Sequence, residues 1–459
     1  MPSQQITRWP IILSPPLKTL PSTSIPPRPI LPLSPPPVLQ STYPPLPYNS
    51  PGRTGPFIPG YTISTHIFPA AWPRCPSSLF APPTGMGAPL GKEAAIELAG
   101  RLAEKKERQE KGDDGREVGK SVLWTVGNRV VRNGAGSRGL GKVKRKGEGV
   151  TLVFLHGIGT HKETWEPTLR RLLNGASSSR YGPQIDEVWL LDGVQHGDAA
   201  LLNEGLLGDT FDLVDYARDL MNFALAYLPA DSAGDLPTNL GRVPEAEIQN
   251  RREHGFKSRT VVGVGHSLGA VYPAVLYPSL FSSLILVESF TIPEYIKHLD
   301  NHRKNETVCL RRQWAWESKE AAIEYVRRSS YYKPWHPEIL REYFQYAFIE
   351  TDDGGYRLKA HPFLEAIMLL ERVSVYEAWQ MLADIDPKTP LHWIWGGKSK
   401  RGGGIEVQTQ TTYRHPGLNS NVWHPGVDHL LPQEVPDLLA DDICQFLGVQ
   451  YPSDLQSKL

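Results

Sequence analysis

A serine between two glycines marks the stretch of this chain best suited to nucleophilic chemistry. Residues 265–269 read Gly-His-Ser-Leu-Gly, with a β-branched run before them and a helix-compatible segment after them. A G-x-S-x-G motif between a strand and a helix places its serine on a tight turn, with the hydroxyl exposed at the carboxyl edge of a parallel sheet. The flanking glycines leave room where neighbouring backbone comes too close for larger side chains. The pattern predicts Ser267 as a nucleophile, although the five residues alone would also fit a plain glycine-rich turn.

The candidate base lies near the end of the chain. A serine hydroxyl is a weak nucleophile at neutral pH, so it needs an imidazole to take its proton and a carboxylate to orient that imidazole. His429 follows the last strand-like run and directly precedes the closing helix, so its ring can reach the carboxyl edge of the sheet. We predict His429 as the base and His424, five residues earlier, as a structural residue.

The acid is harder to assign. The strand-like run 391–395 is followed by two glycines and basic residues, with no carboxylate where an acid would be expected. Glu288 instead follows the apolar run 284–287, where a carboxylate is costly to bury unless it is paired, and His429 would pair it. We predict Glu288 as the acid, although a carboxylate here could also order the hinge of the segment that follows. Glu406, in the loop after 391–395, is the reserve candidate.

Two backbone amides must stabilise the charge that develops on an acyl oxygen during nucleophilic attack. One is predicted from Leu268, at the start of the helix after the serine. The other is predicted from Ile158, directly after a His-Gly pair at the end of the buried run 150–155. His156 and His161 could form a zinc pair, but no carboxylate or cysteine has the spacing of a metal site. We therefore expect neither a metal nor another cofactor.

Strands that alternate with helices must carry these residues. Amphipathic helix-like stretches such as 212–228 and 435–447 alternate with short runs of strand character. The runs lie at residues 61–68, 121–126, 150–155, 188–191, 284–287 and 391–395. The run 188–191 ends in Asp192, much as 284–287 ends in Glu288. Such alternation predicts an α/β fold with a mostly parallel sheet flanked by helices on both faces.

Composition divides the chain into regions. Residues 1–56 hold 17 of the 42 prolines, so we predict a disordered extension, partly polyproline II, that is either a ligand for a proline-binding module or simply does not fold. Residues 57–290 and 386–450 are predicted to form the core of the sheet domain. Residues 291–385 break the alternation and are rich in aromatic and charged residues, so we predict an inserted helical cap. Residues 451–459 are predicted to be a tail.

The overall composition excludes several classes of protein. Lys and Arg balance Asp and Glu at 49 each, so the chain lacks the basic footprint of a nucleic-acid-binding protein. The three cysteines are scattered and suggest a reducing compartment without a disulfide framework. No apolar run approaches the ~18 residues that a transmembrane helix needs.

Five stretches together resemble a known family. They are residues 70–74, 154–169, 263–269, 312–321 and 423–429. These stretches resemble the fungal peroxisomal type of α/β-hydrolase, a group that includes a yeast peroxisomal lipase and hydrolases of AK-toxin biosynthesis. The resemblance covers roughly residues 61–459 and not the proline-rich start. It implies an α/β-hydrolase fold with a helical lid and a Ser-acid-His hydrolase whose nucleophile and base are Ser267 and His429. The missing Asp after Trp395 departs from the family pattern.

The chain ends in Ser457, Lys458 and Leu459, the tripeptide that the peroxisomal import receptor reads. We therefore expect a peroxisomal serine hydrolase, lipase- or esterase-like, that cleaves esters or thioesters of lipid-derived or secondary-metabolite acyl groups in an aromatic-lined pocket. Epoxide and haloalkane hydrolases of this fold use Asp as nucleophile, and position 267 is Ser. The alternative is a catalytically decayed or non-hydrolytic protein that binds an acyl ligand, because fold alone does not fix function.

Overall fold

The structure is a computed structural model, and it describes residues 11–16, 28–75, 89–112, 121–135, 149–178, 183–232, 234–257, 259–267, 279–294, 304–400 and 403–452. Three predicted features lie outside the described residues. These are the helix predicted after Ser267, Leu268 as the second predicted oxyanion donor, and the C-terminal tripeptide Ser457, Lys458 and Leu459.

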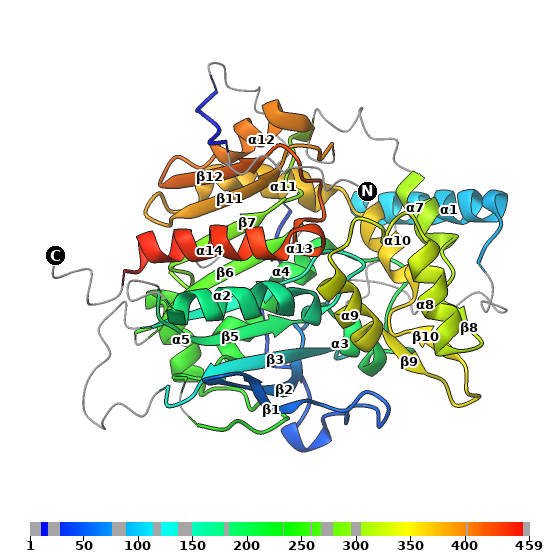
Figure 1. The fold of residues 1–459 in the computed structure, drawn as a ribbon, viewed down its shortest axis with the longest axis horizontal. Coiled ribbons are helices and arrows are strands. Elements are labelled where there is room, and N and C mark those ends of the chain that lie inside the picture. The colour runs from blue at the N-terminus through cyan, green and yellow to red at the C-terminus, as the bar shows by residue number, and fades with distance from the viewer. Residues whose placement is uncertain are drawn as a thin grey trace.

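A large twisted sheet forms the centre of the described part of the chain (Figure 1). Its nine strands have the order β1-β2-β3-β5-β4-β6-β7-β11-β12. They are β1 (Thr54–Ile58), β2 (Tyr61–Pro69), β3 (Trp124–Arg132), β4 (Val150–Leu155), β5 (Ile185–Leu191), β6 (Thr260–His266), β7 (Ser283–Val287), β11 (Leu391–Gly396) and β12 (Asn419–His424). The strands from β5 to β12 pair in parallel, and β1, β2 and β3 pair antiparallel at the other side. The predicted mostly parallel sheet is confirmed.

The central strands are apolar throughout because both faces of the sheet are covered. In β4, Leu152 and Phe154 pack into the hydrophobic core of one face, and Val153 and Leu155 pack into the core of the other. Figure 1 shows α2 and α14 side by side over the first face. The flanking helices are α1 (Lys92–Lys111), α2 (Glu166–Ser178), α3 (Gly197–Leu202), α4 (Leu213–Asn222), α5 (Glu245–His254), α12 (Gly404–Thr412), α13 (Leu431–Glu434) and α14 (Pro436–Gln450). Short 3₁₀ helices lie at η1 (Gln40–Thr42) and η2 (Lys162–Trp165), and α4 continues into the π-helix η3 (Phe223–Tyr227). Such two-sided burial is what produces continuous Val, Ile and Leu runs in parallel strands.

The segment between β7 and β11 contains helices and a small sheet. Its elements are α7 (Lys304–Leu310), β8 (Ala315–Trp316), α8 (Lys319–Arg328), α9 (Pro337–Tyr346), β9 (Phe348–Glu350), β10 (Tyr356–Leu358), α10 (Pro362–Leu370), α11 (Val373–Met381) and η5 (Leu382–Asp384). The antiparallel sheet β8-β10-β9 was not predicted. Its strands and α8 and α9 share a separate aromatic core that includes Trp316, Trp335 and Tyr343. By contrast, α10 and α11 pack into a core of the large sheet, so the predicted cap segment 291–385 contributes to two different cores.

The N-terminal segment differs from the disordered extension predicted for residues 1–56, because its described stretches contact the folded core. Ile11 and Trp423 exchange backbone hydrogen bonds of 2.9 and 2.8 Å at the edge strand β12. Leu13 is buried, and the Arg28 guanidinium forms ion pairs with Asp212 and Glu377. Proline removes a backbone donor but leaves carbonyls and side chains available for such contacts. Among the described residues, no helix is both long and apolar enough to cross a membrane.

Candidate active site

Ser267 occupies a strained turn at the carboxyl end of β6. Its φ angle is 64°, in the left-handed region that non-glycine residues rarely adopt. Two backbone hydrogen bonds hold the turn: Ser267 N–H donates to the Val287 carbonyl at 2.9 Å, and Phe290 N–H donates to the Ser267 carbonyl at 2.8 Å. A residue held in this region costs on the order of 1–3 kcal/mol, so the surrounding structure must fix it. Strain at a serine directly after a strand of the sheet is what a nucleophile elbow requires of its backbone.

Glu288 follows β7 directly and shares this backbone peculiarity. Its φ angle is 44°, and within the described residues only Ser267 and Glu288 combine a positive φ with a side chain. The carboxylate is 2% exposed, accepts a hydrogen bond of 2.6 Å from the Gly396 N–H, and lies 3.0 Å from Nδ1 of His429. Burial raises the pKa of Glu288 to about 7, although the Gly396 amide opposes this shift. The carboxyl group therefore titrates close to neutral pH.

His429 lies between β12 and α13, on a loop that is held from both sides. Its backbone N–H donates to Oδ1 of Asp428 at 2.7 Å, and its carbonyl accepts a hydrogen bond of 2.9 Å from Nε2 of His266. One edge of the imidazole faces the Glu288 carboxylate, and the residue lines the same pocket as Ser267. The structure thus brings the predicted nucleophile, base and acid to one site.

The loop after β4 reaches the same pocket. Ile158 lines it, and no acceptor within the described part of the chain takes the Ile158 N–H. The preceding Gly157 has no room for a side chain, because a Cβ there would lie 2.6 Å from Nδ1 of His266. This contact, which the sequence did not reveal, explains the His-Gly pair: the glycine lets the Ile158 loop pack against the residue next to Ser267.

Two other histidines and one other carboxylate that the sequence analysis considered lie outside the pocket lining. His424, at the end of β12, is buried, and its Nε2 lies 2.6 Å from Oδ2 of Asp442 on α14. Glu406 is exposed on α12 and does not line the pocket. His161 is hydrogen-bonded to Glu163 at 2.9 Å. His424 and His161 therefore form hydrogen bonds with Asp442 and Glu163, and not with Ser267, Glu288 or His429.

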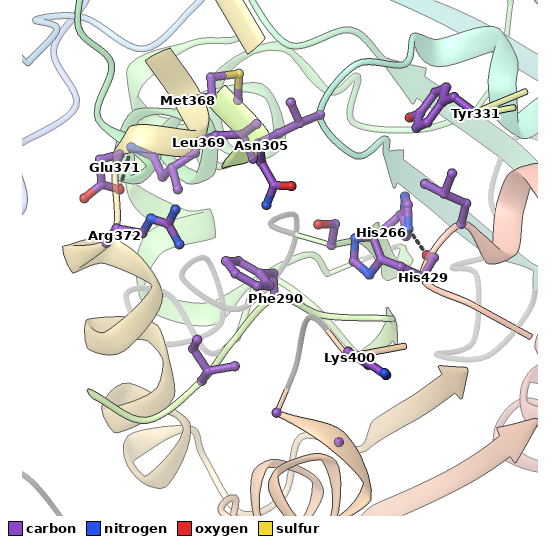
Figure 2. A pocket seen from close by; sticks show the side chains of 17 residues that line it. His266, Phe290, Asn305, Tyr331, Met368, Leu369, Glu371, Arg372, Lys400 and His429 are labelled. Atoms are coloured by element: carbon purple, nitrogen blue, oxygen red, sulfur yellow. Dashed lines mark hydrogen bonds between the residues drawn. The ribbon is translucent and has the colours of Figure 1, made fainter. Parts of the chain in front are cut away.

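The pocket has a volume of about 500 Å³. Its wall contains aliphatic side chains from several elements, namely Ile158, Leu213, Ile292, Met368, Leu369 and Leu430, with Phe290 and Tyr331 as its aromatic members besides the histidines. The lining is therefore more aliphatic than the aromatic-lined pocket predicted from the sequence. Figure 2 shows His266 and His429 on one side of the cavity, with Met368, Leu369 and Arg372 across from them. Of the aliphatic wall residues only Ile158 was predicted at the site, because the others lie on helices such as α4 and α10 or on loops without a motif.

Comparisons with known proteins agree with this architecture. Residues 152–442 match the alpha/beta hydrolase family. The peroxisomal membrane protein LPX1 of Saccharomyces cerevisiae is 31% identical over 229 residues, which cover 45% of this chain and 51% of the relative. The type I acyl-CoA thioesterase mpaH' of Penicillium brevicompactum is 27% identical over 189 residues, covering 39% of this chain and 37% of the relative. The chain thus spans about half the length, or less, of these curated relatives.

One solved structure extends the likeness over most of the chain. The peroxisomal alpha-beta-hydrolase Lpx1 of Saccharomyces cerevisiae has a TM-score of 0.60 and 21% sequence identity. The alignment covers 85% of this chain and 89% of that chain. At this identity the likeness concerns the fold alone.

Proposed function

The chain belongs to the alpha/beta hydrolase family, and we propose that it hydrolyses carboxylic esters or thioesters through an acyl-enzyme on Ser267. The observation that carries the proposal is the 3.0 Å hydrogen bond between Nδ1 of His429 and Oε2 of Glu288, beside a pocket lined by both His429 and Ser267. Nδ1 engaged by a carboxylate leaves Nε2 to exchange a proton with the serine.

The chemistry follows from these positions. His429 takes the proton of the Ser267 hydroxyl as its oxygen attacks the acyl carbon, and the same proton passes to the departing alcohol or thiol. Glu288 holds the imidazole in orientation and stabilises its charged form. The Ile158 amide, together with that of Leu268, stabilises the negative oxygen of the tetrahedral intermediate. A water molecule, activated by His429, then cleaves the acyl-serine ester and regenerates the enzyme.

The pocket favours an acyl group as the part of the substrate that is bound. Its aliphatic wall and volume of about 500 Å³ suit burial of a hydrocarbon chain, and drug-sized ligands occupy pockets of roughly 300–1,000 Å³. The Penicillium relative named as an acyl-CoA thioesterase supports a thioester as substrate. We propose lipid-derived or secondary-metabolite acyl esters and acyl-CoA thioesters as the substrate class.

The yeast relative named as peroxisomal supports a peroxisomal location. We propose that the import receptor binds Ser457, Lys458 and Leu459 at the end of the chain. The alternative of a decayed, non-catalytic protein rested on the missing acid after β11. The contact between Glu288 and His429 weakens that alternative, because it supplies the acid from the end of β7.

Ser267→Ala tests the proposal directly. We expect hydrolysis of p-nitrophenyl acyl esters to fall by at least about 10⁴-fold, and labelling by a fluorophosphonate probe to disappear. Ser330→Ala, at an exposed serine of the α8–α9 connection, is the matched control and should label and hydrolyse normally. Competition of the probe by acyl esters and acyl-CoA thioesters then ranks the substrates. Wild-type activity in a folded Ser267→Ala variant would overturn the mechanism.

A further inference from the structure

A buried ionic network lies directly behind the loop that carries Ile158. Lys162 ends this loop, and its fully buried ammonium lies 2.8 Å from Oδ2 of Asp192, 2.6 Å from Oδ2 of Asp198 and 3.0 Å from Oε1 of Glu163. Burial disfavours the charged ammonium, but the attraction of the three carboxylates outweighs it and holds the pKa of Lys162 well above its usual value. The charged form of Lys162 is therefore favoured in the folded protein.

The segment after β5 holds the Ile158 loop along its length. Three hydrogen bonds join the two segments, from Gly193 N–H to Nε2 of His156 (3.1 Å), from Gly159 N–H to Nε2 of His196 (3.2 Å), and from Lys162 N–H to Oδ1 of Asp192 (2.9 Å). Asp198 N–H donates to the other oxygen of Asp192 at 3.0 Å and so ties the start of α3 to the same carboxylate. The backbone around Ile158 thus rests on the Asp192–Asp198 segment.

Asp198 extends the network to two further parts of the chain. While its Oδ2 accepts from Lys162, its Oδ1 accepts hydrogen bonds from the Lys359 ammonium at 2.6 Å and from the Ser50 hydroxyl at 2.7 Å. Burial acts against the charge of Asp198, but Lys162 and Lys359 outweigh it and lower the pKa of Asp198 to about 2. Lys359 lies between β10 and α10, and Met368 near the end of α10 lines the pocket.

The start of α10 also meets the Ile158 loop at a second point. Gly159 has a φ of +77°, and a Cβ at this position would lie 2.7 Å from Oε2 of Glu365 on α10. Glu365 is itself fixed by an ion pair with Arg312. The loop and the helix therefore touch directly at Gly159 and are linked through Asp198 a short distance away.

We propose that Asp198 is a positioning residue that couples α10 to the Ile158 loop, so that the position of the helix sets the position of the Ile158 amide. The inference rests on the proposed function, because it assigns that amide to the negative oxygen of the intermediate. An oxyanion donor must lie about 2.7–3.1 Å from that oxygen. A displacement of about 1 Å at a reacting centre can cost on the order of 10²-fold in rate. Without the Asp198 charge, Lys359 would lose its carboxylate partner and Lys162 would keep only Asp192 and Glu163.

Lys359→Met tests the coupling with the least damage to the fold, because it removes the link that runs through Asp198 and leaves Lys162 paired with Asp192 and Asp198. We expect kcat for acyl esters to fall about tenfold, with KM changed less than about twofold, since the amide contacts the oxygen only in the transition state. Asp198→Asn should lower kcat further, by about 10–100-fold. Lys359→Arg should restore most of the rate.

Arg357→Gln is the matched control. Arg357 on β10 also forms an ion pair with a residue near α3, Glu204, at 3.0 Å. Glu204 is exposed, and in the described stretches of the chain no hydrogen bond joins it to the Ile158 loop. This variant should keep kcat within about twofold of the wild type. Unfolding curves of all variants separate a loss of rate from a loss of folded protein.

Inhibitor affinity distinguishes positioning from a purely structural role. An alkyl trifluoromethyl ketone forms a tetrahedral adduct that carries the oxyanion, whereas the corresponding alkyl alcohol occupies the pocket without one. We expect Lys359→Met to weaken the ketone about tenfold and leave the alcohol unchanged, since only the adduct uses the amide. Equal weakening of both, or an unchanged kcat in folded Lys359→Met, would overturn the coupling while the wild-type enzyme still hydrolyses esters. A wild-type protein that neither hydrolyses esters nor reacts with a fluorophosphonate overturns the proposed function itself.

Discussion

Two carboxylates follow directly on strands of the same sheet, and the structure gives them different surroundings. Asp192 follows β5 and Glu288 follows β7, and both are 2% exposed. Asp192 faces the ammonium of Lys162, whereas Glu288 faces the imidazole of His429 beside the pocket. Lysine keeps its proton at neutral pH, while histidine gains and loses one there. The end of a strand therefore brings a carboxylate to the right edge of the sheet, but its partner decides whether it can assist proton transfer.

The backbone differs between the two places as well. Glu288 has a left-handed φ of 44°, and the neighbouring Ser267 has one of 64°. Asp192 instead accepts backbone hydrogen bonds from Lys162 and Asp198 and is not among the residues with a positive φ. Strain is concentrated at the proposed catalytic residues, and the Asp192 network supplies rigid support beside them. We infer that the region of Ser267 and Glu288 transfers protons, whereas the region of Asp192 fixes the position of the backbone.

Glu288→Gln gives the largest expected effect and would break the comparison most directly. The amide can replace the carboxylate in size but cannot stabilise a charged imidazole or fix its tautomer. We expect kcat to fall by about 10³–10⁴-fold, as when the acid of a serine triad is replaced by its amide. The measurement is steady-state hydrolysis of p-nitrophenyl acyl esters, with the folded fraction checked by circular dichroism.

Glu406→Gln is the control for that variant. Glu406 was the reserve candidate for the acid, but it is exposed on α12 and away from the pocket lining, so kcat should stay within about twofold of the wild type. Undiminished activity in Glu288→Gln together with a large loss in Glu406→Gln would reverse the assignment of the acid.

Asp192→Asn gives the next largest effect, and we expect it to change the free energy of unfolding more than kcat. Removing one partner of a buried ion pair costs up to about 3–5 kcal/mol, and Lys162 would keep only Asp198 and Glu163 as partners. We expect the free energy of unfolding in urea to fall by about this amount, whereas kcat per folded molecule falls far less than in Glu288→Gln. A folded Asp192→Asn protein of wild-type stability would contradict a supporting role for this network.

The sequence predicted most of the sheet, and Glu288 was chosen as the acid from the order of the strands, because no local pattern separates it from Asp192. Apolar runs reveal strands, and a strand end places both Asp192 and Glu288 at one edge, so periodicity treats them alike. Their partners Lys162 and His429 are 30 and 141 positions away, and no local pattern encodes such contacts. The strands β8 and β9 are two and three residues long, too short to show an alternation. Arg28 was likewise hidden, because its partner Glu377 lies 349 positions along the chain.

The dependence of stability on pH gives the smallest effect and sharpens the comparison at Glu288. Burial raises the pKa of Glu288 from 4.5 to about 7 in the folded protein. Between these values the folded state keeps a proton that the unfolded chain has released, so this group makes unfolding easier as pH rises from 4.5 through 7. The total change is on the order of 3 kcal/mol and is complete above pH 7. Glutamine has no such proton, so Glu288→Gln removes this contribution.

Urea unfolding of wild type and Glu288→Gln between pH 5 and 8 measures this term, with Glu406→Gln as the reference that should run parallel to wild type. We expect the difference in unfolding free energy to move in favour of Glu288→Gln as pH rises, by an amount on the order of 2 kcal/mol. The wild-type kcat/KM should rise over the same range, because only the ionised carboxylate can stabilise a charged His429. Parallel stability curves for all three proteins would mean that Glu288 ionises at its ordinary pKa. The distinction between the two strand ends would then rest on their partners and on backbone geometry, and not on the ionisation of Glu288.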